Sequence, residues 1–188
     1  MRAVSRVFVI TGPSGVGKGT LIRKLRERVP EVELSISATT RAPRKGEEAG
    51  TDYHFLSREE FDRRVMDGEF LEWAEYSGNR YGTLRSEVER RTERGAPVVL
   101  EIEVQGARQV RETEPGAVRI FVEPPSPETL RERLVGRGTD EQEVIERRLE
   151  EARKELRARD EFGHRVVNDD IDRAANELAG IVRSALDG

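Results

Sequence analysis

The chain has 188 residues, of which 35% are apolar and 37% are charged, and it contains no cysteine. This length suits one domain with inserts, and the lack of cysteine excludes disulfides, thiol catalysis and cysteine-bound zinc. The net charge of −4 argues against general nucleic-acid binding. No apolar run approaches the roughly 20 residues of a membrane span, and the first strand begins too early for a signal peptide. We therefore expect a cytoplasmic protein without nucleic-acid or membrane partners.

A phosphate-binding loop is predicted near the N-terminus. An apolar, β-branched run at 7–11 leads into the glycine-rich stretch 12–20, and helical spacing follows from Lys18 to Arg28. Glycines leave no Cβ between the backbone amides and an anion, and Lys18 can follow the β- and γ-phosphates of a nucleotide. The residues expected to bind the donor nucleotide are Gly12, Pro13, Ser14, Gly15, Val16, Gly17, Lys18, Gly19 and Thr20.

The position after the lysine departs from the usual pattern, which places a Ser or Thr there to hold magnesium. This chain has Gly19, and Thr20 follows. Either Thr20 serves as the magnesium ligand, or the metal is held mostly through water and substrate oxygens, which magnesium tolerates.

The rest of the chain alternates between strand and helix patterns, except from about Ser37 to Thr83. A short strand is expected at 32–37, followed by a loop at 37–53 that is rich in hydroxyls, arginine and glycine, as in ligand-binding loops. A capping box at Ser57 opens a short helix, and 70–83 form a hairpin with a glycine turn. Beyond these, strands are expected at 98–103, 117–122 and 166–168, and helices at 84–94, 105–112, 126–135, from about 140, and 171–186.

This order predicts an α/β fold, a three-layer P-loop core whose parallel sheet is covered by helices on both faces. We expect a single domain over 1–188, with a core of about 1–36, 84–135 and 160–188. A small, β-rich and antiparallel insert would occupy about 37–83, and a helical lid about 136–159. Ligands of open α/β sheets lie beyond the carboxyl ends of the strands, so the insert should overhang the phosphate loop.

The insert carries the residues for a second phosphate site. Arg41 and Arg44 lie three apart in a loop too polar to be core, and Tyr53 and Tyr81 come from flanking elements. Two guanidinium groups and two phenols would make a dianion pocket, with each charged hydrogen bond worth about 1.5–3 kcal/mol. The alternative is a solvated basic loop.

Residues 35–55 resemble the nucleoside-monophosphate loop of guanylate kinases. The similarity continues, in the order of that family, through 70–74, 78–83, 100–106, 124–126, 133–139 and 167–169. The resemblance covers almost the whole chain. It implies transfer of the γ-phosphoryl group of ATP to GMP, and to dGMP, with Mg²⁺ and with ADP and GDP as products, in purine nucleotide metabolism.

The same resemblance implies residue roles. Arg41, Arg44, Tyr53 and Tyr81 would bind the GMP phosphate, and Ser37, Glu72 and Thr83 would meet the guanine. Guanine chemistry supports this, because one carboxylate can accept from both N1 and the 2-amino group, whereas adenine has an acceptor at N1. The alternative for Glu72 is an exposed acid on a strand edge.

The resemblance also implies a catalytic set, which consists of Lys18, Arg41, Arg133, Arg137 and Arg148. Arg133, Arg137 and Arg148 resemble lid residues that close over the transferring phosphoryl group. Asn168 would lie near the adenine. Glu101 and Glu103 belong to the GMP side, and their duties stay open between anchoring arginines, ordering magnesium-bound water and reaching GMP.

Two other readings stay open. The first is another monophosphate kinase, such as adenylate kinase, against which Glu72 and the hydroxyls of Ser37 and Thr83 argue. The second is a guanylate-kinase-like module that binds phosphorylated peptides without catalysis. A regulatory GTPase is weaker, because the chain has no Asn-Lys-x-Asp motif. The oligomeric state, monomer or dimer, stays open.

Overall fold

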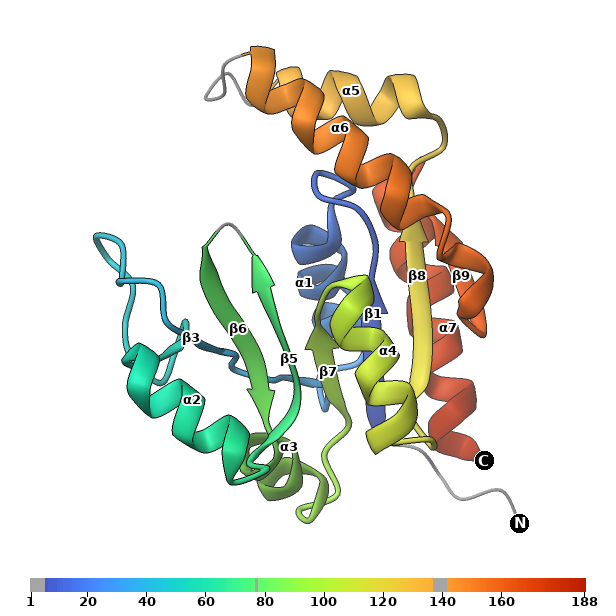
Figure 1. Cartoon of the computed structure of the whole chain (residues 1–188). Helices are drawn as coiled ribbons and strands as arrows, with labels where there is room; N and C mark the ends of the chain where they lie inside the picture. The colour runs from blue at the N-terminus through green and yellow to red at the C-terminus, as the bar shows by residue number, and fades with distance from the viewer. Residues whose placement is uncertain (1–5, 77, 137–141) are drawn as a thin grey trace.

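The structure is a computed structural model that describes residues 6–76, 78–136 and 142–188. The central strands are β1 (Val7–Thr11), β2 (Glu33–Leu34), β7 (Val98–Glu101), β8 (Val118–Glu123) and β9 (His164–Val167). They form one sheet in the order β2-β7-β1-β8-β9, and every pairing is parallel (Figure 1). The predicted parallel core is confirmed.

Helices cover both faces of this sheet, as the uninterrupted apolar run of β1 requires. On one face, Phe8 and Ile10 pack with α1 (Lys18–Arg28) and α7 (Ile171–Asp187). On the other face, Val7 and Val9 pack with α3 (Arg85–Thr92) and α4 (Val104–Thr113). All five residues of β1 are therefore buried, and the phosphate loop leaves the sheet from a rigid strand.

A second sheet forms the insert from β3 (Ala38–Thr39), β4 (His54–Phe55), β5 (Phe70–Tyr76) and β6 (Asn79–Leu84), in the order β4-β3-β6-β5. Phe61 of α2 (Arg58–Met66) packs on it, and the side chain of Ser57 caps that helix as predicted. Two expectations are wrong. The sheet is mixed, because β3 and β4 run parallel. The strand expected at 32–37 is shorter, because β2 ends at Leu34, and β3, which belongs to the insert, begins only at Ala38.

A β-bulge in the insert sets the direction of Glu72. Phe70 pairs with Leu84, but Glu72 pairs with Thr83, so β5 carries one extra residue at this point. That residue, Leu71, packs into the apolar cluster beneath α4. Bulges redirect side chains and are frequent beside functional sites. Here the bulge places Glu72 next to the Thr83 hydroxyl.

The last part of the fold is a pair of helices above the carboxyl end of the central sheet, α5 (Pro127–Val135) and α6 (Gln142–Leu156) (Figure 1). Ser126 caps α5 as predicted, and Leu134 and Leu149 take part in the small apolar cluster between the helices. A 3₁₀ turn, η1 (Arg159–Glu161), leads to β9. Arg137 lies outside the described residues. None of the helices described has the length and apolar character needed to cross a bilayer.

Candidate functional site

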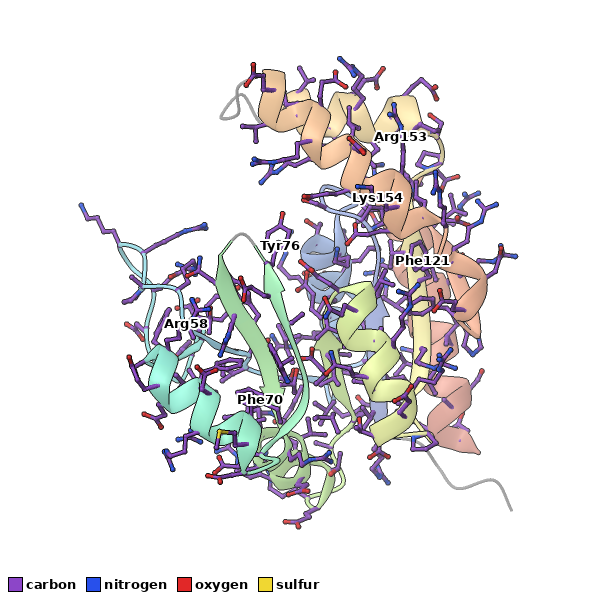
Figure 2. The ribbon with its side chains drawn as sticks, in the orientation of Figure 1. Arg58, Phe70, Tyr76, Phe121, Arg153 and Lys154 are labelled. Carbon is purple, nitrogen blue, oxygen red and sulfur yellow. The ribbon has the colours of Figure 1, made fainter. Side chains whose placement is uncertain are left out.

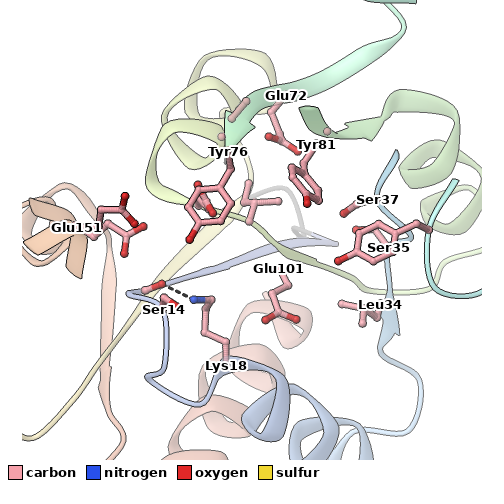
Figure 3. Close-up of a pocket in the computed structure, with 18 of the residues that line it drawn as sticks. Ser14, Lys18, Leu34, Ser35, Ser37, Glu72, Tyr76, Tyr81, Glu101 and Glu151 are labelled. Carbon is pink, nitrogen blue, oxygen red and sulfur yellow. Dashed lines mark hydrogen bonds between the residues drawn. The ribbon is translucent and has the colours of Figure 1, made fainter. Parts of the chain in front are cut away.

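A cavity of about 450 Å³ lies where the core, the insert and α6 meet. This volume is in the range of small-molecule sites. Figure 3 shows Lys18 and Ser14 on one side of the cavity and Glu72, Tyr81 and Ser37 on the other. The predicted site residues in its lining are Gly12, Ser14, Lys18, Ser37, Tyr53, Glu72, Tyr81, Glu101, Glu103 and Arg148. The other predicted site residues that the structure describes do not belong to this lining.

The phosphate loop has the backbone geometry of an anion-binding nest. Gly15 and Gly17 have φ angles of +84° and +97°, which favour glycine. Gly17 precedes α1 and gives it no side-chain cap, so the first amides of the helix face outward. A Cβ on Gly12 would lie 2.2 Å from the carbonyl oxygen of Val122, which only a glycine permits. Lys18 Nζ donates to the carbonyl oxygens of Gly12 and Pro13, at the mouth of the loop.

Two predicted residues support the loop from behind. The buried amide of Asn168 donates to the carbonyl oxygen of Val16 at 2.8 Å. Arg133 on α5 donates to the same carbonyl at 3.2 Å and to that of Asn168 at 2.8 Å. The structure therefore joins Arg133 and Asn168 to the middle of the loop. Their expected contacts with the transferring phosphoryl group and with adenine stay predictions.

The opposite wall holds a buried carboxylate. Glu72 is 5% exposed, and its Oε1 accepts a hydrogen bond of 2.7 Å from the Thr83 hydroxyl. Burial raises the pKa of Glu72 to about 7, against the effect of Thr83. A Cβ on Gly106 of α4 would lie 2.3 Å from Oε2 of Glu72. Gly106 ends one of the motifs of the family resemblance, in which it had no predicted role, and the structure explains it as the space for this carboxylate.

The two tyrosines expected at the acceptor phosphate lie together in the cavity lining, but the two arginines expected there do not belong to it. The rings of Tyr53 and Tyr81 are 6.2 Å apart, and both line the cavity. Arg41 lies over the ring of Tyr53 at 5.2 Å and pairs with Glu47 at 2.8 Å, which raises the pKa of Arg41. Arg44 is exposed. Neither arginine belongs to the cavity lining, so their contact with a phosphate stays a prediction.

Carboxylates surround the lysine side of the cavity. Glu101 and Glu103 have solvent access within the cleft, but its walls partly desolvate them and raise the pKa of each, while Lys18 opposes the shift. Burial, together with the charges of Glu103 and Glu151, raises the pKa of Glu155 to about 7, and Lys18 again opposes it. Glu155 lines the cavity together with Ser14 and Lys18, so α6 lies against the phosphate loop.

Sequence reasoning predicted Arg148 on α6 but missed Glu151 and Glu155. Arg148, Glu151 and Glu155 are three and four residues apart, so they share one face of the helix, and all three line the cavity. The spacing was visible in the sequence, but many charged residues follow such a spacing on solvated helices. Tyr76, also missed, lies at the end of β5 that faces α6 (Figure 2) and completes the lining there.

The residues suggested for magnesium are of the right chemical type but are dispersed. Thr20 is exposed and lies outside the cavity lining, and a Cβ on Gly19 would meet nothing within 4 Å. Among the residues described, no group of three or more His, Cys, Asp or Glu side chains is arranged to hold a metal. The oxygens of Glu101 and Glu103 suit magnesium that keeps several water ligands.

Comparisons with known proteins agree with this geometry. Residues 4–185 match the family model described as guanylate kinase. The chain is 55% identical to a guanylate kinase of Rubrobacter xylanophilus, covering 97% of this chain and 96% of the relative. It is 55% identical to one of Synechococcus sp., covering 94% and 93%. A crystal structure of guanylate kinase from Anaplasma phagocytophilum superposes with a TM-score of 0.77 at 36% identity, covering 97% of this chain and 87% of that one. The chain therefore belongs to the guanylate kinase family.

Proposed function

We propose that this enzyme transfers the γ-phosphoryl group of ATP to GMP, and also to dGMP, and releases ADP and GDP. The observation that carries the proposal is that one cavity has a phosphate loop with Lys18 on one side and the buried Glu72 beside Tyr81 on the other. Family membership over nearly the full chain supports catalysis over a module that only binds, and so does the retained Lys18. We propose that the chain acts as one domain with core, insert and lid.

In this proposal the loop amides and Lys18 bind the β- and γ-phosphates of ATP, because both supply positive charge at a helix N-terminus. A phosphate oxygen of GMP attacks the γ-phosphorus, and the bond from that phosphorus to the β–γ bridging oxygen breaks, so that ADP leaves. No general base is required, because the attacking oxygen is already anionic. Phosphoryl transfer depends chiefly on positioning and charge stabilisation, for which Arg148, Arg133 and Arg137 are assigned to the lid.

Guanine selection is assigned to Glu72. Its ionised carboxylate can accept from N1 and from the 2-amino group, while Ser37 and Thr83 offer hydroxyls to the other edge of the base. Tyr53 and Tyr81, together with Arg41 and Arg44, are assigned to the GMP phosphate. Adenine would leave the buried carboxylate of Glu72 partly unpaired, which disfavours AMP as the acceptor.

Magnesium belongs to the proposal as the partner of ATP. When bound, it neutralises charge on the β- and γ-phosphates. Glu101 and Glu103 supply oxygens that suit its water ligands, and Thr20 is the remaining hydroxyl candidate. A cytoplasmic location and the absence of nucleic-acid and membrane partners stay predictions from the sequence.

A coupled assay of ADP release tests the proposal, with ATP as donor and GMP, dGMP, AMP, UMP or dTMP as acceptor. We expect GMP to give the highest kcat/KM and dGMP to follow. Lys18→Met should reduce kcat by at least about 10²-fold, because a charge stabilising the transition state is lost. The far-UV circular dichroism should stay unchanged, since Lys18 packs in no apolar cluster. An equal or higher kcat/KM for AMP would refute the assignment of the acceptor.

A further inference from the structure

A single residue separates the two sheets where the chain leaves the core. The N–H of Ser35 bonds to a carbonyl of β7 at 2.9 Å, which is a contact within the central sheet. The carbonyl of Ser37 accepts from the N–H of His54 at 2.9 Å, which is a contact within the insert. Between them, the N–H of Ile36 donates to Oε1 of Glu87 at 3.0 Å. The Glu87 side chain therefore binds the backbone at the residue where the core ends and the insert begins.

Glu87 also lies where the chain returns to the core. The last strand of the insert ends at Leu84, α3 begins at Arg85, and Glu87 belongs to the first turn of that helix. The positive end of the helix dipole favours a carboxylate at this position. Glu87 is only 4% exposed. The two crossings between core and insert are thus joined through one buried carboxylate.

Ionisable side chains connect Glu87 to both the core and the insert. Oε1 of Glu87 lies 2.5 Å from the guanidinium of Arg91, and both side chains are buried. Nε of Arg91 lies 3.0 Å from Glu33 of β2, on the core side. Nε2 of His54 in β4, on the insert side, lies 3.5 Å from Oε2 of Glu87. A buried ion pair contributes little net stability compared with apolar packing. This network therefore points to a role in positioning the insert relative to the core.

We propose that Glu87 is a positioning residue for the acceptor nucleotide. By fixing Ile36, it sets where Ser37 and the following strand β3 lie relative to the phosphate loop. This inference rests on the proposed function, in which Ser37 faces the guanine. Ser37 and Ser35 line the cavity, whereas Glu87 stands behind its wall and is not part of the lining that the described residues form. Its loss should therefore weaken the use of GMP and spare the use of ATP.

The main test is the double variant Glu87→Leu/Arg91→Met, which removes the acceptor of the Ile36 N–H without leaving a buried charge unpaired. We expect the KM for GMP to rise about tenfold, which corresponds to one lost hydrogen bond to a charged acceptor. The KM for ATP should stay within about twofold, because Glu87 contacts no part of the phosphate loop. The emission of Trp73, the sole tryptophan of the chain, gives the Kd for GMP independently of turnover.

Two single variants complete the design. Glu87→Gln keeps an oxygen that can accept from Ile36 and should retain the KM for GMP. Glu89→Gln, an exposed acid on the same helix, is the matched control and should change nothing. Glu87→Asp keeps the charge but withdraws the acceptor by one methylene, so it should raise the KM for GMP even if the double variant does not fold.

An unchanged KM for GMP in the folded double variant would overturn the inference, and so would an equal rise in the KM values for both nucleotides. If the double variant does not fold, an unchanged KM for GMP in Glu87→Asp overturns it. The wild-type enzyme separates this outcome from failure of the proposed function. If wild type does not phosphorylate GMP, the function is wrong whatever the variants do.

Discussion

The selection of guanine by Glu72 gives the sharpest prediction. Glu72→Gln preserves the shape of the side chain and an oxygen for the Thr83 hydroxyl, but it presents an NH₂ group where guanine presents its own donors. The lost interaction is a hydrogen bond to a buried charged acceptor, worth about 1.5–3 kcal/mol. We therefore expect kcat/KM for GMP to fall about 10- to 100-fold. The value for AMP should change little, because adenine does not use the charge of Glu72.

The pKa of Glu72 adds a second signature. Burial raises this pKa to about 7, and guanine requires the ionised form. The ionised fraction falls as the pH drops through 7, so lowering the pH from 8 to 6 should weaken guanine binding about tenfold, or ~1.4 kcal/mol. In Glu72→Gln this dependence should disappear. Guanosine is the suitable ligand for this measurement, because it lacks the phosphate whose own titration near pH 6 would interfere.

The assay compares kcat/KM for GMP and AMP in wild type, Glu72→Gln and the control Glu75→Gln at pH 6, 7 and 8. Glu75 lies on the same strand and is exposed, so its substitution should leave every value within about twofold. A ratio of GMP to AMP that does not change in Glu72→Gln would refute the reasoning. The same pH dependence of guanosine binding in wild type and Glu72→Gln would refute the role of the buried charge.

Two further predictions concern the walls of the cavity. Gly106→Ala places a Cβ 2.3 Å from Glu72 Oε2, so it should displace the carboxylate and raise the KM for GMP at least tenfold. The control is Gly180→Ala, in another helix with open space around it, which should leave the kinetics unchanged. Thermal unfolding should show that this control raises the stability by about 0.5–1 kcal/mol. Glu155→Gln removes a carboxylate that is increasingly ionised above pH 7 in the cavity wall shared with Lys18 and Ser14. It should tighten ATP binding more at pH 8 than at pH 6, and calorimetric titration that finds equal effects at both values contradicts this.

Local signals in the sequence were sufficient for most of the fold. The glycine spacing from Gly12 to Gly17 and the capping residues Ser57 and Ser126 act within a few residues, and the structure has the corresponding loop and helices where they predict them. The strand expected at 32–37 is shorter in the structure for a physical reason. Its alternating apolar pattern suits a strand, but the pattern does not show that Ser35 bonds to the central sheet and Ser37 to the insert. The side chain that binds Ile36 between them, Glu87, is 51 residues away.

The candidate site was predicted less completely, because part of it depends on contacts between distant elements. Glu72 was implied by the resemblance and supported by the chemistry of guanine. Its burial depends on the bulge and on Gly106, and neither can be read from spacing. Glu155 looks like any acid on a solvated helix until α6 is placed on the phosphate loop. The sequence context of Arg41 suggested a phosphate ligand, which stays a prediction, but it did not indicate that Arg41 pairs with Glu47.

The central claim is that two anion sites face each other across one cavity, with guanine held at Glu72. A crystal structure of the enzyme with adenosine and guanosine joined through a polyphosphate chain tests it most directly. We predict phosphates that extend from the amides around Lys18 toward Tyr53 and Tyr81, with guanine N1 and the 2-amino group about 3 Å from the carboxylate of Glu72. A guanosine half that lies outside the cavity, or a guanine edge turned away from Glu72, would contradict the claim.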